Sequence, residues 1–421
     1  MKQTEIGLIP DDWEVKRLGD SVDILRGGSP RPIENYLTTN ADGINWIKIG
    51  DVKPNDKYIR KTEEKIIPEG KSRSREVKKG DFILSNSMSF GRPYILAIDG
   101  CIHDGWLTIQ KYAETFDKEF LYYLLGSDEV FNQYVQMAAG SSVQNLNKDK
   151  VTDLQLKIPP LPEQQRIAKA LSDVDALIST TEKLIQKKKN IKQGAMQNLL
   201  TGKKRLPGFG PQTKSPTYKQ TELGPIPDDW EVKTLGEIGY FIGGGTPDTN
   251  KTEYWKGSIP WISSSDISKN NIKDVFPTRF ITKSAIENSA TKICPKNTIL
   301  IVSRVGVGKL AISKNEVCTS QDFSNFICEQ QNVEFVAYQL LPMMQNKSSD
   351  AQGTSIKGIT SDEIQNMKIT LPSKEEQTAI ANVLSSMDKE IETLNTKQEK
   401  YRNLKTAMMQ QLLTGKIRLI K

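Results

Sequence analysis

QTEIGLIPDDWEVK at residues 3–16 recurs, with two changes, as QTELGPIPDDWEVK at residues 220–233. LLTGK at residues 199–203 likewise recurs at 412–416. The spacing between these copies far exceeds the roughly 20 to 50 residues of a solenoid repeat. The 421 residues are therefore expected to form two copies of one unit, each large enough to hold a domain of its own.

The first part of each copy has the pattern of short strands joined by turns. Alternation of apolar and polar residues predicts half-buried strands, and denser apolar runs that lead into glycine turns predict further strands. Short helices are expected to follow. The predicted strands are Trp46–Asp51, Asp81–Ser85, Trp261–Asp266 and Thr298–Ser303, and the predicted helices surround Phe120–Leu125 and Phe335–Leu341. Each copy should thus contain a mixed α+β domain of about 150 residues.

The last part of each copy, 162–200 and 373–413, predicts a long helix. Apolar residues recur at alternating spacings of three and four, which is typical of a coiled-coil seam. Pro162 suits a helix start, Ser373 and Glu376 predict a capping box, and Gly202 and Gly415 predict C-terminal caps. One small domain cannot bury such a stripe, so the two helices are expected to pair antiparallel. The predicted seam residues are Ile167, Leu171, Val174, Ile178, Ile185, Leu199, Ile380, Leu384, Met387, Ile391, Leu394, Tyr401, Met408 and Leu412.

The predicted organisation follows from these boundaries: a first domain at 1–161, a helix at 162–202, a linker at 203–219, a second domain at 220–372, and a second helix with a tail at 373–421. The linker assignment depends on its Pro and Gly content. The fold class is therefore α+β, with two similar mixed α/β domains separated by two long antiparallel helices.

Composition narrows the possible functions. The 58 Lys and Arg residues against 51 Asp and Glu residues give a formal net charge of +7, which favours a polyanionic partner such as nucleic acid. The four cysteines form no CxxC pair, and His103 is the single histidine, so a zinc site or a Ser/His/Asp triad is not expected. No apolar run reaches the roughly 18 residues of a membrane span, and a cytoplasmic location is expected.

Taken together and in order, these motifs resemble the specificity subunit of type I restriction-modification systems. The resemblance rests on the IPxDWEVKxLG opening, the Gly-Gly-x-Pro loop, the tryptophan strand, the turn Ser303–Lys309, the helix opening EQQRIA at 163–168 and the LLTGK ending. It covers essentially the whole chain. It implies that each domain reads half of a bipartite sequence in double-stranded DNA. It also implies that the helices set the spacer and dock two adenine methyltransferase subunits, and that motor-nuclease subunits complete the endonuclease.

Base-contacting residues are expected where the copies differ in polar type, at 31–75 against 248–289 and at 102–113 against 319–330. The basic stretch Lys71–Lys79 adds arginines that can bind phosphates or guanine edges. The candidates in the first copy are Arg31, Lys53, Arg73, Arg75, Asn86, Ser87, Arg92, His103 and Gln144. Those in the second copy are Thr246, Lys251, Ser264, Ser265, Arg279, Ser303, Arg304, Lys309, Gln321 and Lys357.

The chain itself is expected to be non-catalytic. Pro159-Pro160 lacks the preceding Asn or Asp of an amino-methyltransferase motif, and Gly308-Lys309 lacks the rest of a P-loop. No catalytic residue, metal or cofactor is therefore expected, and the resemblance implies that S-adenosylmethionine binds in the partner methyltransferases. The alternatives are the specificity subunit of a related modification-only or combined restriction-modification enzyme, a stand-alone DNA-modifying enzyme, or an architectural coiled-coil protein.

Overall fold

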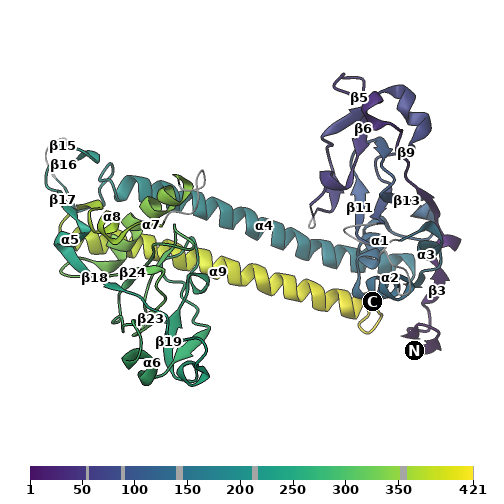
Figure 1. The fold of residues 1–421 in the computed structure, drawn as a ribbon. Helices are drawn as coiled ribbons and strands as arrows, with labels where there is room; N and C mark the ends of the chain where they lie inside the picture. Colours follow the sequence, from purple (N-terminus) through teal and green to yellow (C-terminus); the bar gives the residue numbers. More distant parts are fainter. Residues whose placement is uncertain (54–55, 87–90, 139–145, 211–216, 351–357, 421) are drawn as a thin grey trace. The chain divides into compact units, whose positions relative to one another are not determined.

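The computed structural model describes residues 1–53, 56–86, 91–138, 146–210, 217–350 and 358–420 (Figure 1). The chain divides into two compact units: unit 1 comprises residues 1–182 and 396–421, and unit 2 comprises residues 183–395. Each unit therefore contains one α/β domain and parts of the two long helices α4 (Leu161–Leu199) and α9 (Lys374–Leu412). This division follows packing, and the domain boundaries inferred from the sequence stay a prediction.

The described residues of unit 1 form two five-stranded sheets, ordered β4-β13-β10-β11-β7 and β5-β8-β6-β12-β9, and the two-stranded pairs β1-β2 and β3-β14. Its strands are β1 (Lys2–Thr4), β2 (Gly7–Ile9), β3 (Glu14–Arg17), β4 (Asp23–Arg26), β5 (Leu37–Thr38), β6 (Ile44–Ile47), β7 (Tyr58–Ile59), β8 (Glu64–Ile66), β9 (Arg75–Val77), β10 (Phe82–Ser85), β11 (Pro93–Leu96), β12 (Gly100–Ile102), β13 (Trp106–Gln110) and β14 (Gln155–Ile158). Its short helices are α1 (Lys118–Leu125), α2 (Asp128–Ala138) and α3 (Lys148–Thr152).

The part of unit 2 that the structure describes repeats this plan with a four-stranded sheet β18-β24-β21-β22, a three-stranded sheet β20-β19-β23, and the pairs β15-β16 and β17-β25. Its strands are β15 (Tyr218–Thr221), β16 (Gly224–Pro227), β17 (Glu231–Thr234), β18 (Gly239–Gly243), β19 (Ile259–Ile262), β20 (Arg279–Ile281), β21 (Ile299–Val302), β22 (Leu310–Ile312), β23 (Cys318–Thr319), β24 (Phe323–Cys328) and β25 (Lys368–Leu371). Its short helices are α5 (Leu235–Ile238), α6 (Lys283–Glu287) and α8 (Ser361–Gln365), and α7 (Val333–Asp350) is longer.

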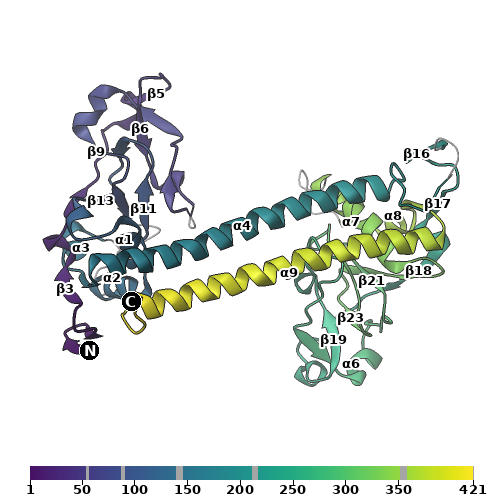
Figure 2. The same ribbon diagram turned by 180° about the vertical axis from the view of Figure 1, so that it is seen from behind.

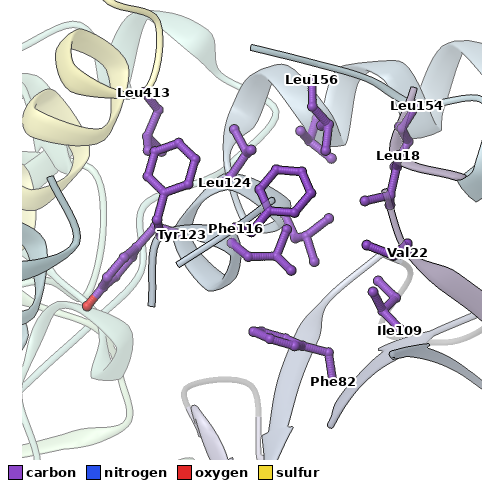
Figure 3. Packing of buried hydrophobic residues seen from close by; sticks show 14 of the residues in the cluster. Leu18, Val22, Phe82, Ile109, Phe116, Tyr123, Leu124, Leu154, Leu156 and Leu413 are labelled. Atoms are coloured by element: carbon purple, nitrogen blue, oxygen red, sulfur yellow. The ribbon is translucent and has the colours of Figure 1, made fainter. Parts of the chain in front are cut away.

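The main core of unit 1 joins the sheet to the helices. Phe82 of β10 and Ile109 of β13 belong to the same buried cluster as Tyr123 and Leu124 of α1 and Leu413, which follows α9 (Figure 3). Burial of large apolar side chains contributes roughly 1.5 to 3 kcal/mol each. The end of the second helix is therefore part of the hydrophobic core of the first domain.

The long helices run antiparallel, and each unit shows this independently. In unit 1, Leu171 near the start of α4 shares a buried cluster with Leu412 at the end of α9. In unit 2, Leu199 at the end of α4 shares a cluster with Ile380 near the start of α9. Figure 2 shows the two helices side by side. The predicted fold class, with its internal repeat and antiparallel helices, is confirmed.

The predicted seam residues are all buried or half-buried along α4 and α9. The half-buried ones are Ile178, Met387, Leu394, Tyr401 and Met408. Polar residues at the same spacing, such as Lys192, are also buried and form ion pairs. Among the described residues, no helix combines the length and apolar composition that crossing a membrane requires.

The two tryptophan strands are shorter than predicted. β6 ends at Ile47 and β19 at Ile262, and a 3-10 turn follows each strand. The Asp51 carboxylate accepts the Lys48 N–H at 2.7 Å, and Asp266 accepts the Ser263 N–H at 2.7 Å. These caps pull the backbone out of the sheet, which the alternating pattern could not indicate.

The predicted helix boundaries and caps are close to those observed. α4 begins one residue before Pro162, and α7 extends beyond the expected helix around 335–341. Gly202 and Gly415 have φ values of 69° and 71°, the left-handed conformation of a helix C-terminal cap. Ser373 Oγ accepts the Glu376 N–H at 3.3 Å, but the Glu376 carboxylate binds Arg205 instead of completing a capping box.

Candidate nucleic-acid interface and helix grooves

A glycine loop after β4 lies directly on the turn between β12 and β13. A Cβ atom on Gly27 would lie 2.1 Å from the His103 carbonyl oxygen, so only glycine fits there. The Gly27 N–H donates to the Trp106 carbonyl at 2.8 Å, and Gly28 N–H donates to the Ile102 carbonyl at 3.1 Å. This close approach brings the loop's next polar residues to the tip of the turn.

Asp104 at that tip is the centre of a polar cluster. Its Oδ1 accepts from Ser29 Oγ at 3.0 Å and lies 3.0 Å from His103 Nε2, and its Oδ2 accepts from Arg31 Nη2 at 3.2 Å. Asn86 Nδ2 donates to the Asp104 carbonyl at 3.0 Å. Burial acts to raise the pKa of Asp104, but the charge of His103 and the hydrogen bonds from Ser29 and Arg31 outweigh it and lower that pKa.

Unit 2 has the same arrangement with different side chains. A Cβ atom on Gly244 would lie 1.9 Å from the Ser320 carbonyl oxygen, so the second glycine loop also packs on a turn. Thr246 Oγ1 donates to Gln321 Oε1. Ser303 donates to the Asp322 carbonyl through both its N–H, at 2.8 Å, and its Oγ, at 3.0 Å. Thr246, Ser303 and Gln321, all predicted from the sequence, therefore meet at one place.

The remaining candidates of the first copy are spread more widely. Arg75 Nε donates to the Arg26 carbonyl at 3.3 Å beside the glycine loop, and the Arg73 guanidinium lies 5.6 Å from the centroid of the Tyr36 ring. The Lys53 N–H donates to Asp56, and the Arg92 N–H donates to Ser85 Oγ, so these backbones are held by other segments. Ser87 and Gln144 lie outside the described residues.

In the second copy, Arg279 stacks over Trp261 at 4.3 Å from the ring centroid, a cation–π contact that holds the guanidinium in place. Ser264 accepts from Lys309 Nζ at its carbonyl at 2.8 Å. The other candidates contact near neighbours: Ser265 Oγ lies 2.8 Å from Ser263 Oγ, Lys251 Nζ donates to Tyr254 Oη at 3.3 Å, and Arg304 is exposed next to Ser303. Lys357 lies outside the described residues.

Two equivalent clusters, each centred on one arginine, bind the ends of the long helices to the domains. In unit 1, Arg418 binds Glu163 with Nε and Nη2, both at 2.7 Å, and Asp12 with Nη1 and Nη2 at 2.9 and 2.8 Å. The Glu163 carboxylate also accepts from Trp13 Nε1 at 3.0 Å. The hydrogen bonds that Arg418 donates to Glu163 and Asp12 raise the pKa of Arg418, and the bond to Asp12 lowers the pKa of that carboxyl group.

In unit 2, Arg205 repeats the ion pairs of this cluster, whereas the buried Trp230 Nε1 has no hydrogen-bond partner among the described residues. Arg205 binds Glu376 with Nε at 2.5 Å and Nη2 at 2.6 Å, and it binds Asp229 with two further bonds of 2.9 Å. Its guanidinium lies 5.7 Å from the centroid of the Trp230 ring. The arginine that follows each LLTGK ending thus binds an aspartate of an IPDDW opening, at 9–13 in unit 1 and at 226–230 in unit 2.

A second pair of equivalent clusters lies between the helices. In unit 1, Asp175 of α4 accepts from Tyr123 Oη at 2.6 Å and pairs with Lys405 of α9 at 2.7 Å. In unit 2, Asp388 of α9 accepts from Tyr338 Oη at 2.7 Å and pairs with Lys192 of α4 at 2.5 Å. Burial and these hydrogen bonds raise the pKa values of both tyrosines.

Beside each of these clusters lies a groove. The groove of unit 1 has a volume of about 1380 Å³ and includes Ile178, Lys405 and Met409 in its lining. The groove of unit 2 has a volume of about 980 Å³ and includes Ile391 and Lys192. The helices also carry the exposed apolar side chains Leu177, Leu184 and Leu404. Met196 and Val383 are half-buried, and Leu413, just after α9, is buried in the core.

Sequence reasoning missed several of these residues. Asp104 and Ser29 were absent from the candidates, although Asp104 occupies the position of Gln321 in the repeat and was open to the same argument. Arg205 and Arg418 also had a signal, because LLTGKKRL at 199–206 and LLTGKIRL at 412–419 share the arginine. Asp175 and Asp388 stand at equivalent places in the two helices, each directly after a seam residue, where coiled coils commonly carry charge, so the pattern did not single them out.

Comparison with known proteins agrees with this architecture. A family model described as the type I restriction modification DNA specificity domain matches residues 10–192 and again residues 227–400. The chain is 26% identical over 430 residues to the type I restriction enzyme MjaVIII specificity subunit of Methanocaldococcus jannaschii, covering 97% of this chain and 94% of the relative. It is 39% identical over 191 residues to the MjaIX specificity subunit of the same organism, covering 43% of each chain.

A solved chain from a study of the assembly and conformational transition of the type I restriction-modification system has the same fold. Its TM-score is 0.60 at 18% identity, over 97% of this chain and 100% of that chain. The two domain matches cover most of the sequence, and the protein belongs to the family of type I restriction-modification specificity subunits. It is the component that recognises the DNA target, and such subunits are generally non-catalytic.

Proposed function

We propose that each α/β domain reads one half of a bipartite DNA sequence through the turn and glycine loop described above. The observation that carries this proposal is the contrast between the two copies at one shared site. Both copies place a hydroxyl side chain against the tip of a turn, yet Ser29 faces Asp104 in one and Thr246 faces Gln321 in the other. A common framework with different polar groups suits two readers of different base sequences.

We also propose that the helix pair sets the unread gap and docks two methyltransferase subunits. The two grooves support this partner number, because one lies in the described residues of each unit and equivalent residues, such as Lys405 and Lys192, line both. S-adenosylmethionine would bind in those subunits and not in this chain. Motor-nuclease subunits would then complete a complex that cleaves DNA, whereas without them the complex would only modify it.

The test of this function is methylome sequencing of cells that carry the chain with its methyltransferase partner. The expected result is one methylated motif with two specific halves and an unread gap between them. A continuous motif, or methylation that does not depend on this chain, would contradict the proposal.

The purified chain alone is expected neither to bind S-adenosylmethionine nor to methylate or cleave DNA. The physical reason is that the sequence lacks the motifs for those chemistries. Isothermal titration with S-adenosylmethionine and a tritium-transfer assay measure this, with the reconstituted methyltransferase complex as the positive control. Methyl transfer by the single component would show that the chain is itself an enzyme.

Replacing Arg73 and Arg75 together with Ala is expected to weaken recognition of the first half-site by about 1 to 3 kcal/mol for each true base contact. Both side chains are exposed beside the glycine loop. Recognition of the second half-site should not change. Competition binding of the complex to DNAs mutated in either half measures this.

The matched control replaces Lys78 and Lys79, which are exposed in the same basic stretch and of which Lys78 pairs with Glu76 at 2.7 Å. Equal weakening for all DNA sequences in the arginine variant would mean that Arg73 and Arg75 bind phosphates only.

A further inference from the structure

The tip of the β12–β13 turn and its equivalent in unit 2 present one side chain each. In both, a hydroxyl after the glycine loop donates to that side chain, and Asp104 Oδ1 also lies 3.0 Å from His103 Nε2. Ser29 follows the first glycine loop and donates to Asp104 Oδ1 at 3.0 Å. Thr246 follows the second glycine loop and donates to Gln321 Oε1. The hydroxyl therefore fixes one oxygen of each side chain, and the chemistry of the second terminal atom distinguishes the two domains.

In unit 1 that second atom is Oδ2 of Asp104, which accepts from Arg31 Nη2 at 3.2 Å. The Arg31 side chain is 79% exposed, so its guanidinium is anchored at one nitrogen and otherwise open to solvent. A carboxylate that orients one edge of a guanidinium leaves further N–H donors for a base. Arginine donating two hydrogen bonds to O6 and N7 is the commonest specific contact to guanine.

In unit 2 that second atom is Nε2 of Gln321, and the contacts of the described residues include no partner for it. Gln321 is exposed. Its Oε1 accepts from Thr246 and keeps a second lone pair, while Nε2 keeps its two hydrogens. An amide of this kind can accept from N6 and donate to N7 of adenine, the pairing that glutamine favours in the major groove.

We propose that Gln321 reads an adenine in the half-site of unit 2, and that Asp104 is a positioning residue that aims Arg31 at a guanine in the half-site of unit 1. This assignment rests on the proposed DNA-reading function and adds the base class at one position of each half-site. The different side chains at the equivalent positions 104 and 321 then explain why the two half-sites differ at one base, a guanine in one and an adenine in the other.

The experiment uses the full chain with its methyltransferase partner and reads each motif by methylome sequencing. Gln321→Glu keeps the size of the side chain but removes the amide donor. Sites that carry the adenine at one base pair of the second half-site should be modified about 10-fold less or lower still. The bases required in the first half-site should not change. The unchanged half is an internal control for folding, because the same molecule reads both halves.

The corresponding variants of unit 1 are Asp104→Asn and Arg31→Ala, singly and together. If Asp104 acts through Arg31, both single variants relax the same guanine position, and the double variant relaxes it no further than Arg31→Ala alone. Ser29→Ala, which removes the hydroxyl and keeps the carboxylate, should give a smaller change at the same position. Variants that alter different positions would overturn the coupling of Asp104 to Arg31.

Two failures are distinguishable. If the unaltered chain yields no bipartite motif, the proposed function itself is wrong. If it yields one but Gln321→Glu and Asp104→Asn leave both halves at the original level, or lower modification of all sequences equally, then positions 104 and 321 do not choose bases. Thermal melts of the assembled complexes within about 2 °C of the unaltered one show that the variants are folded.

Discussion

Replacing Arg205 with Ala (R205A) is expected to lower the free energy of unfolding of unit 2 by about 3 to 5 kcal/mol. The Glu376 side chain is 1% exposed and that of Arg205 is 11% exposed, so the substitution leaves a buried carboxylate without its cation. Lysine at this position (R205K) should not restore the loss, because a single ammonium group cannot donate in the fork geometry that binds Glu376 and Asp229 together. Native-state hydrogen exchange of β17 and β25 amides measures the change.

The matched control is Lys368→Ala, which removes an ion pair to Glu222 whose side chains are 41% and 57% exposed. Exposed ion pairs contribute about 0 to 1 kcal/mol to the free energy of unfolding, so that free energy should be nearly the same in this variant as in the original chain. A loss below about 1 kcal/mol for R205A would contradict the role assigned to the arginine cluster. Arg418→Ala tests the equivalent cluster in unit 1.

Inserting four residues in each long helix, after Ile185 of α4 and after Leu394 of α9, is expected to lengthen the unread DNA gap by one or two base pairs. Lys188 pairs with Glu390 at 2.7 Å, which sets the register and makes these two insertion points nearly level. Four residues add about 6 Å along a helix and rotate the rest of that helix by about 40°. With duplex base pairs about 3.4 Å apart, the added length corresponds to fewer than about two steps.

Both half-site sequences should stay the same in this variant, because neither domain is changed. Methylome sequencing compares the gap with that of the original chain, which half-sites about one helical turn apart place at about 5 to 8 bp. The control is the same four residues inserted after Gly208, in an exposed segment outside both helices. An unchanged gap, or an altered half-site, would show that the helices do not set the distance.

The sequence by itself determined the repeat and the long helices. These two features depend on local periodicity and on identity between two stretches of one chain, both of which can be read without coordinates. The antiparallel direction of the helices was an expectation, and the structure confirms it because each unit packs the start of one helix against the end of the other. The capping glycines Gly202 and Gly415 were also predictable, because a left-handed residue after a helix favours glycine strongly. The family resemblance, which rests on the order of the same motifs, indicated that the protein reads DNA.

Tertiary structure alone decided which polar residues act together. Arg205 and Glu376 are 171 residues apart in the chain, and Ser29 and Asp104 are 75 apart, so no spacing rule joins them. The shortened tryptophan strands have a local cause instead, since the Asp51 carboxylate, three residues away, competes with the sheet for the Lys48 N–H. Periodicity records which side of an element is buried, whereas hydrogen-bond partners depend on where distant segments meet, and only folding brings those segments together.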